Sequence, residues 1–226
     1  MPIIFISLNE TFIELVKKNG FHGELIQIQK YIPNTNKKTY YVSPANSLCF
    51  MDGGIDHALS RVIFPNIEKR VKEIVKELNI KNILGQYYLP IGSSIIIDNL
   101  ENIIDNDNKF TSSLVISPTM LLPHDVSNTK NAYYSTMAIL YNILINKKEN
   151  LEEVDILFTS LCCGYGKMNE TDSFNQIMDG IRDYKLYEPK IINDWFVYKE
   201  PNLYDQPKYY ENSAWFHIKP QDIIKQ

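Results

Sequence analysis

The sequence predicts an α/β fold with a mostly parallel sheet, because short apolar runs alternate with helical patterns and the chain opens with a strand–helix–strand unit. The first strand is predicted from Ile3 to Leu8. Asn9 can cap a helix with an apolar stripe at residues 12–16, which ends before Asn19 and Gly20. A second strand is predicted from Leu25 to Ile28. A helix that connects two neighbouring strands is typical of parallel pairing.

The same alternation continues to about residue 185. Beyond a polar turn at 33–38, further strands are predicted at Tyr40–Val42, Ser94–Ile97, Leu114–Ser117 and Asp155–Thr159. Further helices are predicted at Ile55–Ile63, Asn66–Leu78, from a cap at Ser127 or Asn128 to Leu144, and around Phe174, Ile177, Met178 and Ile181. Residues 85–91 and the Asn- and Asp-rich residues 99–109 are predicted as loops.

The 226 residues suit one domain of generous size, which we place at residues 1–185. Residues 186–226 contain several prolines and aromatics but little periodicity. We expect them to form a C-terminal extension packed on the domain, held by Trp195, Tyr209, Tyr210 and Trp215.

Composition excludes several classes of protein. The net charge of −4 argues against broad binding to nucleic acid or to acidic membranes. No apolar run approaches the roughly 20 residues that span a bilayer, and the apolar start at residues 1–7 is too short for a signal sequence. Three cysteines, two of them adjacent, form no even disulfide framework and favour a reducing compartment. We therefore expect a cytoplasmic or nuclear protein without a membrane partner.

The stretch from Val42 to Leu59 contains the clearest candidate site. A buried strand enters it and a helical pattern leaves it, and the loop between them contains Asn46, the pair Gly53-Gly54 and two aspartates. Ligands of open α/β sheets bind at the carboxyl ends of the strands. Glycines allow close approach of the backbone to a ligand, and free N–H groups at a helix start favour an anion.

A second loop of the same kind follows the last predicted strand. Residues 163–167 read Cys-Gly-Tyr-Gly-Lys and precede a helix. A Gly-x-Gly turn in this position can wrap a diphosphate with backbone N–H groups.

The central stretch resembles the signature of the macro domain, an ADP-ribose-binding α/β module. Residues 43–46 (Ser-Pro-Ala-Asn) and 52–56 (Asp-Gly-Gly-Ile-Asp) match its two parts, in the form of a divergent branch similar to ADP-ribose-1″-phosphate phosphatases. The resemblance implies a three-layer α/β/α domain with a mixed, largely parallel sheet. It also implies a metal-independent hydrolase without a cofactor, acting on ADP-ribose-1″-phosphate or a mono-ADP-ribosylated target. The alternative is a non-catalytic ADP-ribose or nucleotide reader. We expect a monomer.

The resemblance also assigns roles to residues. Asn46 would bond the distal ribose and Asp56 would orient or activate a water. The implied ligand-binding residues are Ala45, Asn46, Asp52, Gly53, Gly54, Ile55, Cys163, Gly164, Tyr165, Gly166 and Lys167.

Structural explanations stand beside these roles. Asn46 can cap its turn and Asp56 can cap the following helix. Asp52 could be a second carboxylate near the ribose or a turn residue, and His57 fits a surface or core-edge position. The cysteines fit small buried positions better than nucleophiles, although Cys162 or Cys163 acting with His124 stays an alternative.

The chain departs from the family pattern at the adenine site. Residues 29–32 (Gln-Lys-Tyr-Ile) stand where the family has an aspartate that bonds the adenine amino group, and Ser43 replaces the first Asn of the signature. Adenine recognition could have moved to Asn9, Tyr31 or another aromatic.

Overall fold

The structure is a computed structural model that describes residues 3–34, 36–100, 112–184, 190–192 and 195–197. The chain divides into two compact units, residues 1–184 and 185–226. The described part of the second unit is an antiparallel pair of strands, β7 (Lys190–Ile192) and β8 (Trp195–Val197), which the sequence did not predict. Tyr209, Tyr210 and Trp215 lie outside the described residues, and the packing of the extension on the domain stays a prediction.

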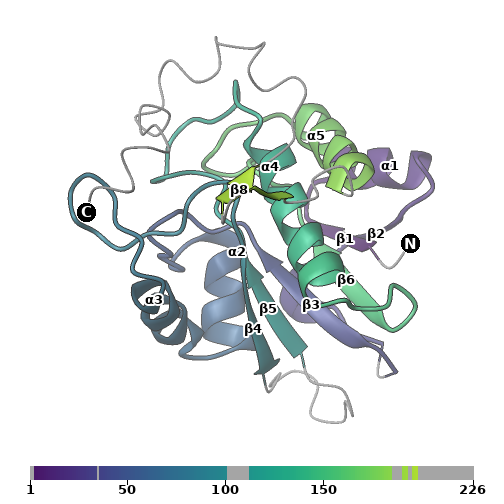
Figure 1. Cartoon of the computed structure of the whole chain (residues 1–226). Helices are drawn as coiled ribbons and strands as arrows, with labels where there is room; N and C mark the ends of the chain where they lie inside the picture. The colour runs from purple at the N-terminus through teal and green to yellow at the C-terminus, as the bar shows by residue number, and fades with distance from the viewer. Residues whose placement is uncertain (1–2, 35, 101–111, 185–189, 193–194, 198–226) are drawn as a thin grey trace. The chain divides into compact units, whose positions relative to one another are not determined.

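The first unit is built around a six-stranded mixed sheet (Figure 1). Its strands are β1 (Ile3–Ser7), β2 (His22–Leu25), β3 (Lys38–Ser43), β4 (Ile95–Leu100), β5 (Ser112–Ile116) and β6 (Val154–Phe158). Its helices are α1 (Glu10–Lys18), α2 (Gly54–His57), α3 (Ile67–Glu77), α4 (Asn131–Leu140) and α5 (Glu170–Asp183). The strand order is β2-β1-β6-β3-β5-β4, in which β4 pairs antiparallel with β5 and the other pairs are parallel.

Helices cover both faces of this sheet, which confirms the predicted three-layer α/β/α class. On one face Phe5 of β1 packs edge-on against Phe12 of α1, which in turn contacts Phe174 of α5. Alternate strand residues point to the other face, where Tyr41 and Leu157 share a buried cluster with residues of the α2 and α3 side. The two faces are shown in Figure 1, with α4 and α5 on one side and α3 on the other.

Several helix boundaries follow the sequence signals. The Asn9 side chain accepts a hydrogen bond from the Phe12 N–H at 2.9 Å, so Asn9 caps α1 as predicted. The helix ends before Gly20, whose φ of 79° is a left-handed conformation that glycine adopts without strain. The predicted helices at 55–63 and 66–78 are present, but the first continues from α2 into a π-helical segment, η2 (Ala58–Ile63).

Other boundaries correct the prediction. The second strand is β2 (His22–Leu25) and not Leu25–Ile28, because pairing with β1 places His22 opposite Ile4 and Ser7 opposite Leu25. Residues Ile28–Lys30 form a short 3₁₀ turn, η1. The fourth helix begins at Asn131 rather than after Ser127 or Asn128, since the Ser127 hydroxyl bonds Asp125 instead. That helix continues as a second π-helical segment, η3 (Tyr141–Asn146). Strand β4 extends to Leu100, into the predicted loop at 99–109, whose residues 101–109 lie outside the described residues.

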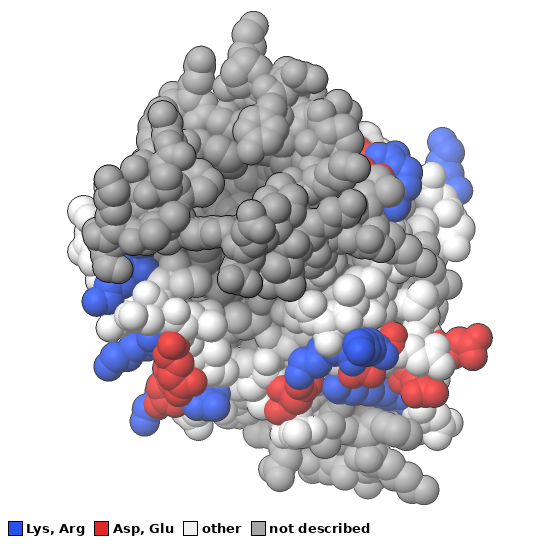
Figure 2. All heavy atoms as spheres, viewed as in Figure 1, with Lys and Arg blue, Asp and Glu red and all other residues white. Residues whose placement is uncertain are grey.

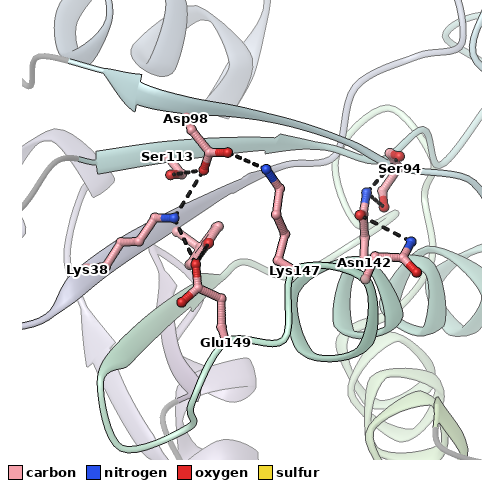
Figure 3. Close-up of polar contacts among 9 residues, drawn as sticks. Lys38, Ser94, Asp98, Ser113, Asn142, Lys147 and Glu149 are labelled. Carbon is pink, nitrogen blue, oxygen red and sulfur yellow. Dashed lines mark hydrogen bonds and ion pairs between the residues drawn. The ribbon is translucent and has the colours of Figure 1, made fainter.

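A network of ion pairs and hydrogen bonds lies at the amino-terminal ends of β3 and β5 (Figure 3). Lys38 Nζ contacts Asp98 Oδ1 at 3.1 Å and Glu149 Oε1 at 2.8 Å, and Lys147 pairs with the other oxygen of Asp98. The Ser113 hydroxyl donates to Asp98 at 2.8 Å. Burial opposes ionisation of Asp98, but these three donors outweigh it and lower the pKa of Asp98 to about 2. The network therefore joins β3, β4 and the segment after η3 through ion pairs, and β5 through the Ser113 hydrogen bond.

We expect Asp98→Asn to lower the free energy of unfolding by about 1–3 kcal/mol at pH 7, because Lys147 loses the carboxylate that it pairs with and Lys38 is left with Glu149. The pKa of Asp98 is depressed from its ordinary 3.8, so its contribution is complete above about pH 4 and is lost as the pH falls toward about 2. Urea denaturation at pH 7 and at pH 3 measures this. The control Glu73→Gln breaks an exposed pair with Arg70 and should cost under about 0.5 kcal/mol. Equal effects of the two variants would contradict the assignment.

Within the described residues, no helix is both long and apolar enough to cross a membrane. On the face of the molecule in Figure 2, Lys and Arg side chains of the described residues are interspersed with Asp and Glu side chains and form no patch of one sign.

Candidate functional site

The two glycine loops meet at the carboxyl edge of the sheet. Strands β3 and β6 are parallel neighbours, so the segments that follow Ser43 and Phe158 leave the sheet at the same edge. An ideal Cβ built on Gly53 would lie 3.5 Å from Cε2 of the Tyr165 ring. The Tyr165 side chain is otherwise largely exposed, at 71%. The structure therefore brings together the two loops that the sequence singled out.

The first loop is shaped by the Asn46 side chain. Its amide nitrogen donates to the Phe50 carbonyl at 3.1 Å, and its oxygen accepts from the N–H groups of Leu48 at 3.1 Å and Phe50 at 3.4 Å. The backbone around it is tied to the strand-like segment after β5, since the Ser47 N–H donates to the Met120 carbonyl at 2.8 Å. Asn46 thus makes the turn contacts of the structural explanation, and its role toward ribose stays a proposal.

Asp56 lies in α2 at the end of this loop. It does not cap the helix, because Gly53 occupies the cap position and no side-chain cap is formed there. Its Oδ1 accepts a hydrogen bond of 2.6 Å from the hydroxyl of Ser43, the last residue of β3. Burial raises the pKa of Asp56 to about 7, the Ser43 hydrogen bond opposes this rise, and the charge of Asp52 adds to it. A carboxylate that titrates near neutral pH suits a general base.

The remaining predicted residues of the first loop differ in how far they are exposed to solvent. Ala45 is fully buried, and its carbonyl accepts from the Thr119 N–H at 3.0 Å, which anchors the loop. Asp52 and Gly54 are exposed, and Ile55 is half-buried. Gly54 has a φ of 54°, a left-handed conformation that glycine adopts without strain, although a Cβ there would meet no atom within 4 Å. His57 is exposed, which selects the surface position from the two predicted alternatives.

The second loop is tightly folded around Gly166. A Cβ on Gly166 would come within 2.4 Å of the Cys162 carbonyl oxygen and 2.7 Å of a methyl of Val126. The Gly166 carbonyl accepts from the Val126 N–H at 2.9 Å, and the Lys167 N–H closes a turn onto Gly164 at 3.1 Å. Cys162 and Lys167 both have left-handed backbone conformations, with φ of 65° and 54°. Non-glycine residues rarely adopt this conformation, and such strain gathers at functional sites.

The three cysteines lie in buried or half-buried positions where the thiolate form is disfavoured. Burial, together with the charge of Asp56, raises the pKa of Cys49 to about 12, and burial raises that of Cys162 to about 12. Half-buried Cys163 also has a raised pKa, chiefly through burial, and its thiol faces the Leu161 carbonyl. His124 is hydrogen-bonded to the carbonyl of Leu122. No described group of three or more His, Cys, Asp or Glu side chains is arranged to hold a metal ion.

Neither named candidate for adenine recognition is free at this edge. The Asn9 amide donates to Glu170 at 2.8 Å while its oxygen caps α1. Tyr31 is buried and lines a cavity of about 750 Å³ with Ile4, Lys37 and Asp155. These last three residues lie at or just before the amino-terminal ends of β1, β3 and β6, which in parallel strands is the edge opposite the loops. We therefore correct the suggestion that Tyr31 contacts a base bound between the loops.

Sequence reasoning missed the partnership of Ser43 with Asp56. It treated Ser43 as a departure from the family signature, whereas the structure makes it a hydrogen-bond donor to the candidate base. The two residues are 13 positions apart, and no periodic pattern predicts that a strand end and a helix start will meet.

Comparison with known proteins gives structural matches but no sequence matches. No protein-family model and no curated protein matches the chain. The chain is similar to macrodomains. One is the Oceanobacillus iheyensis macrodomain with MES bound (TM-score 0.49, 17% identity, covering 70% of this chain and 73% of that one). Another is the macrodomain of Mycobacterium tuberculosis DarG (TM-score 0.46, 13% identity, 68% and 88%). A third is Thermosipho africanus DarTG in complex with ADP-ribose (TM-score 0.47, 13% identity, 80% and 50%).

Proposed function

We propose that this chain binds an ADP-ribose derivative between its two glycine loops and hydrolyses it, with Asp56 assisting the attacking water. The observation that carries the proposal is the meeting of Gly53 and Tyr165 at the edge of the sheet where α/β proteins bind ligands. At the same edge, the Asp56 carboxylate accepts a hydrogen bond from Ser43, the last residue of β3. The substrate would be ADP-ribose-1″-phosphate or a mono-ADP-ribosylated target. No residue arrangement in this proposal requires a metal or a cofactor.

The loops supply what a dinucleotide-like ligand needs. We expect the turns at Gly53-Gly54 and at Gly164–Gly166 to offer backbone N–H groups to the ligand, because such groups can hold a diphosphate without a basic patch. Lys167 is largely exposed and adds one positive charge. Its Nζ lies 3.8 Å from Oδ2 of Asp125. Asn46 would position the distal ribose, for which the amide must give up part of its contact with the Phe50 carbonyl.

The second candidate function is that of a non-catalytic reader of ADP-ribose. The bonding of Asn46 favours it, because both polar atoms of that amide already hold the loop together. A reader needs the glycine loops for binding but needs no general base. The two functions therefore share the binding experiment and differ in turnover.

Calorimetric titration with ADP-ribose tests the shared part, and we expect heat of binding with a dissociation constant below about 1 mM. Phosphate release from ADP-ribose-1″-phosphate and ADP-ribose release from a modified protein then test hydrolysis. The absence of both heat and thermal stabilisation at about 1 mM ligand would reject the binding site. Binding without any turnover would leave the reader.

Two substitutions of different size at Gly53 test whether the ligand binds between the loops. Alanine fits, because its Cβ would make an ordinary contact of 3.5 Å with Tyr165, whereas the two methyl groups of valine reach further into the space between the loops. We expect Gly53→Val to weaken binding at least about tenfold, equivalent to about 1.4 kcal/mol, and Gly53→Ala to weaken it much less. Equal affinity of Gly53→Val and the unaltered chain would place the ligand elsewhere.

A further inference from the structure

Ser43 holds the Asp56 carboxylate against the end of the sheet. Ser43 is fully buried, and its carbonyl accepts a hydrogen bond of 3.0 Å from the Ser117 N–H beyond the end of β5. The strand ladder therefore fixes its backbone, and close packing restricts its side chain. Its hydroxyl carries one proton, which it donates to Asp56 Oδ1 at 2.6 Å.

The hydrogen bond to Ser43 connects the helix that carries Asp56 to the end of β3. Helix α2 has four residues before it changes into η2, and no side chain caps its start. Among the described residues, Ser43 provides the side-chain hydrogen bond that reaches the Asp56 carboxylate. With Oδ1 held by the strand end, Oδ2 is the oxygen that can accept a proton from a bound water.

The surroundings of Asp56 otherwise disfavour its charge. Asp52 in the same loop is negative and raises the pKa of Asp56, and the Cys49 thiol is neutral. The neighbouring His57 is exposed, and Lys72 of α3 lies near enough to Cys49 to lower that thiol's pKa. A hydroxyl that donates to the ionised carboxylate favours the charged form.

We propose that Ser43 is the positioning residue for Asp56: its hydroxyl holds Oδ1 of the carboxylate and leaves Oδ2 to act as the base. This rests on the proposed hydrolysis. Ser43 is also the residue that departs from the family signature. In this chain its hydroxyl is the hydrogen-bond donor to Asp56. Ser43 does not touch the reacting atoms and acts through Asp56 alone.

The test compares Ser43→Ala with Ser43→Thr and Ser47→Ala. Threonine keeps the hydroxyl. Ser47 is an equally buried serine in the loop that follows β3, and its hydroxyl has no hydrogen-bond partner among the described residues, so its removal is a matched control. The first readout is the pH titration of the Asp56 carboxyl carbon by NMR, assigned through Asp56→Asn. The second is the pH dependence of turnover. We expect Ser43→Ala to move both midpoints upward by about one pH unit, as loss of a hydrogen bond to a charged group does.

The two readouts separate the outcomes. Ser43→Thr and Ser47→Ala should titrate like the unaltered chain, and smaller Ser43→Ala should remain folded. An unchanged Asp56 midpoint in Ser43→Ala overturns the proposal, as does a moved midpoint with an unmoved turnover profile. An unaltered chain without turnover on any substrate counts against the proposed hydrolysis alone, because the NMR titration decides the Ser43–Asp56 pairing without a substrate.

Discussion

Replacement of Asp56 by asparagine is expected to lower turnover by about 10²–10⁴-fold, the usual contribution of a general base. Affinity for ADP-ribose should stay within several-fold, because the carboxylate acts on water and not chiefly on the ligand. Asparagine keeps an oxygen that can accept the Ser43 hydroxyl, so the geometry of α2 is preserved. Single-turnover rates and calorimetric titration measure the two effects separately.

The same substitution should stabilise the unliganded chain at alkaline pH. The pKa of Asp56 is about 7 in the folded chain against an ordinary 3.8, so the folded state binds the proton more tightly than the unfolded state. Stability tied to that proton is complete below about pH 4 and is lost as the pH rises through 7. Asparagine carries no charge, and we expect a gain of about 2 kcal/mol over the unaltered chain at pH 8, with little difference at pH 4.

The control for these effects is Asp52→Asn, which removes a carboxylate from the same loop. Asp52 is exposed, so its loss should change stability by under about 0.5 kcal/mol at either pH. Denaturation curves of the two variants and the unaltered chain at pH 4, 6 and 8 make the comparison. Parallel stabilities of Asp56→Asn and the unaltered chain across this range would show that the carboxylate is not held in an unfavourable environment. Full turnover by Asp56→Asn would show that Asp56 is not the general base of the reaction.

The fold could be predicted from the sequence where the signals are local. Apolar runs located the strands, and Asn9 and Gly20 marked the two ends of α1 because a cap and a left-handed turn each act within a few residues. The predicted position of the second strand was wrong because its apolar residues do not belong to one strand. Leu25 is exposed at the end of β2, whereas Ile28 is buried and lies in a 3₁₀ turn. The α4 boundary failed because Ser127 found a nearer partner in Asp125.

The candidate site could be predicted as two loops but not as a set of contacts. The glycines and Asp56 were visible as a motif, and the parallel sheet explains why β3 and β6 bring both loops to one edge. Which polar groups bond each other depends on distances between segments far apart in the chain. Two asparagine side chains are therefore hydrogen-bonded within the protein: Asn46 bonds the backbone of its own turn, and Asn9 bonds Glu170. Ser43 proved to be the partner of Asp56.

Replacement of Gly166 by alanine is expected to disrupt the second loop. The added Cβ would be placed 2.4 Å from the Cys162 carbonyl oxygen, which is backbone and cannot rotate away. The same carbonyl accepts the Met168 N–H at 3.1 Å, and Gly166 itself accepts from Val126, so a shift of either strains two hydrogen bonds. We expect a loss of about 1–3 kcal/mol in the free energy of unfolding, or a fall in Tm of about 2–10 °C.

Gly164→Ala is the matched comparison within the same loop. A Cβ at Gly164 would meet no atom within 4 Å, and its φ lies outside the left-handed region, so this variant should keep the Tm within about 2 °C. Thermal unfolding without ligand separates the two variants, and ADP-ribose titration then asks whether the loop shaped by Gly166 holds the ligand. Because the backbone N–H groups of this loop would be displaced, Gly166→Ala should bind at least about tenfold more weakly at a temperature where it remains folded. A destabilised Gly166→Ala chain with undiminished affinity would confirm the packing of the loop and remove it from the binding site.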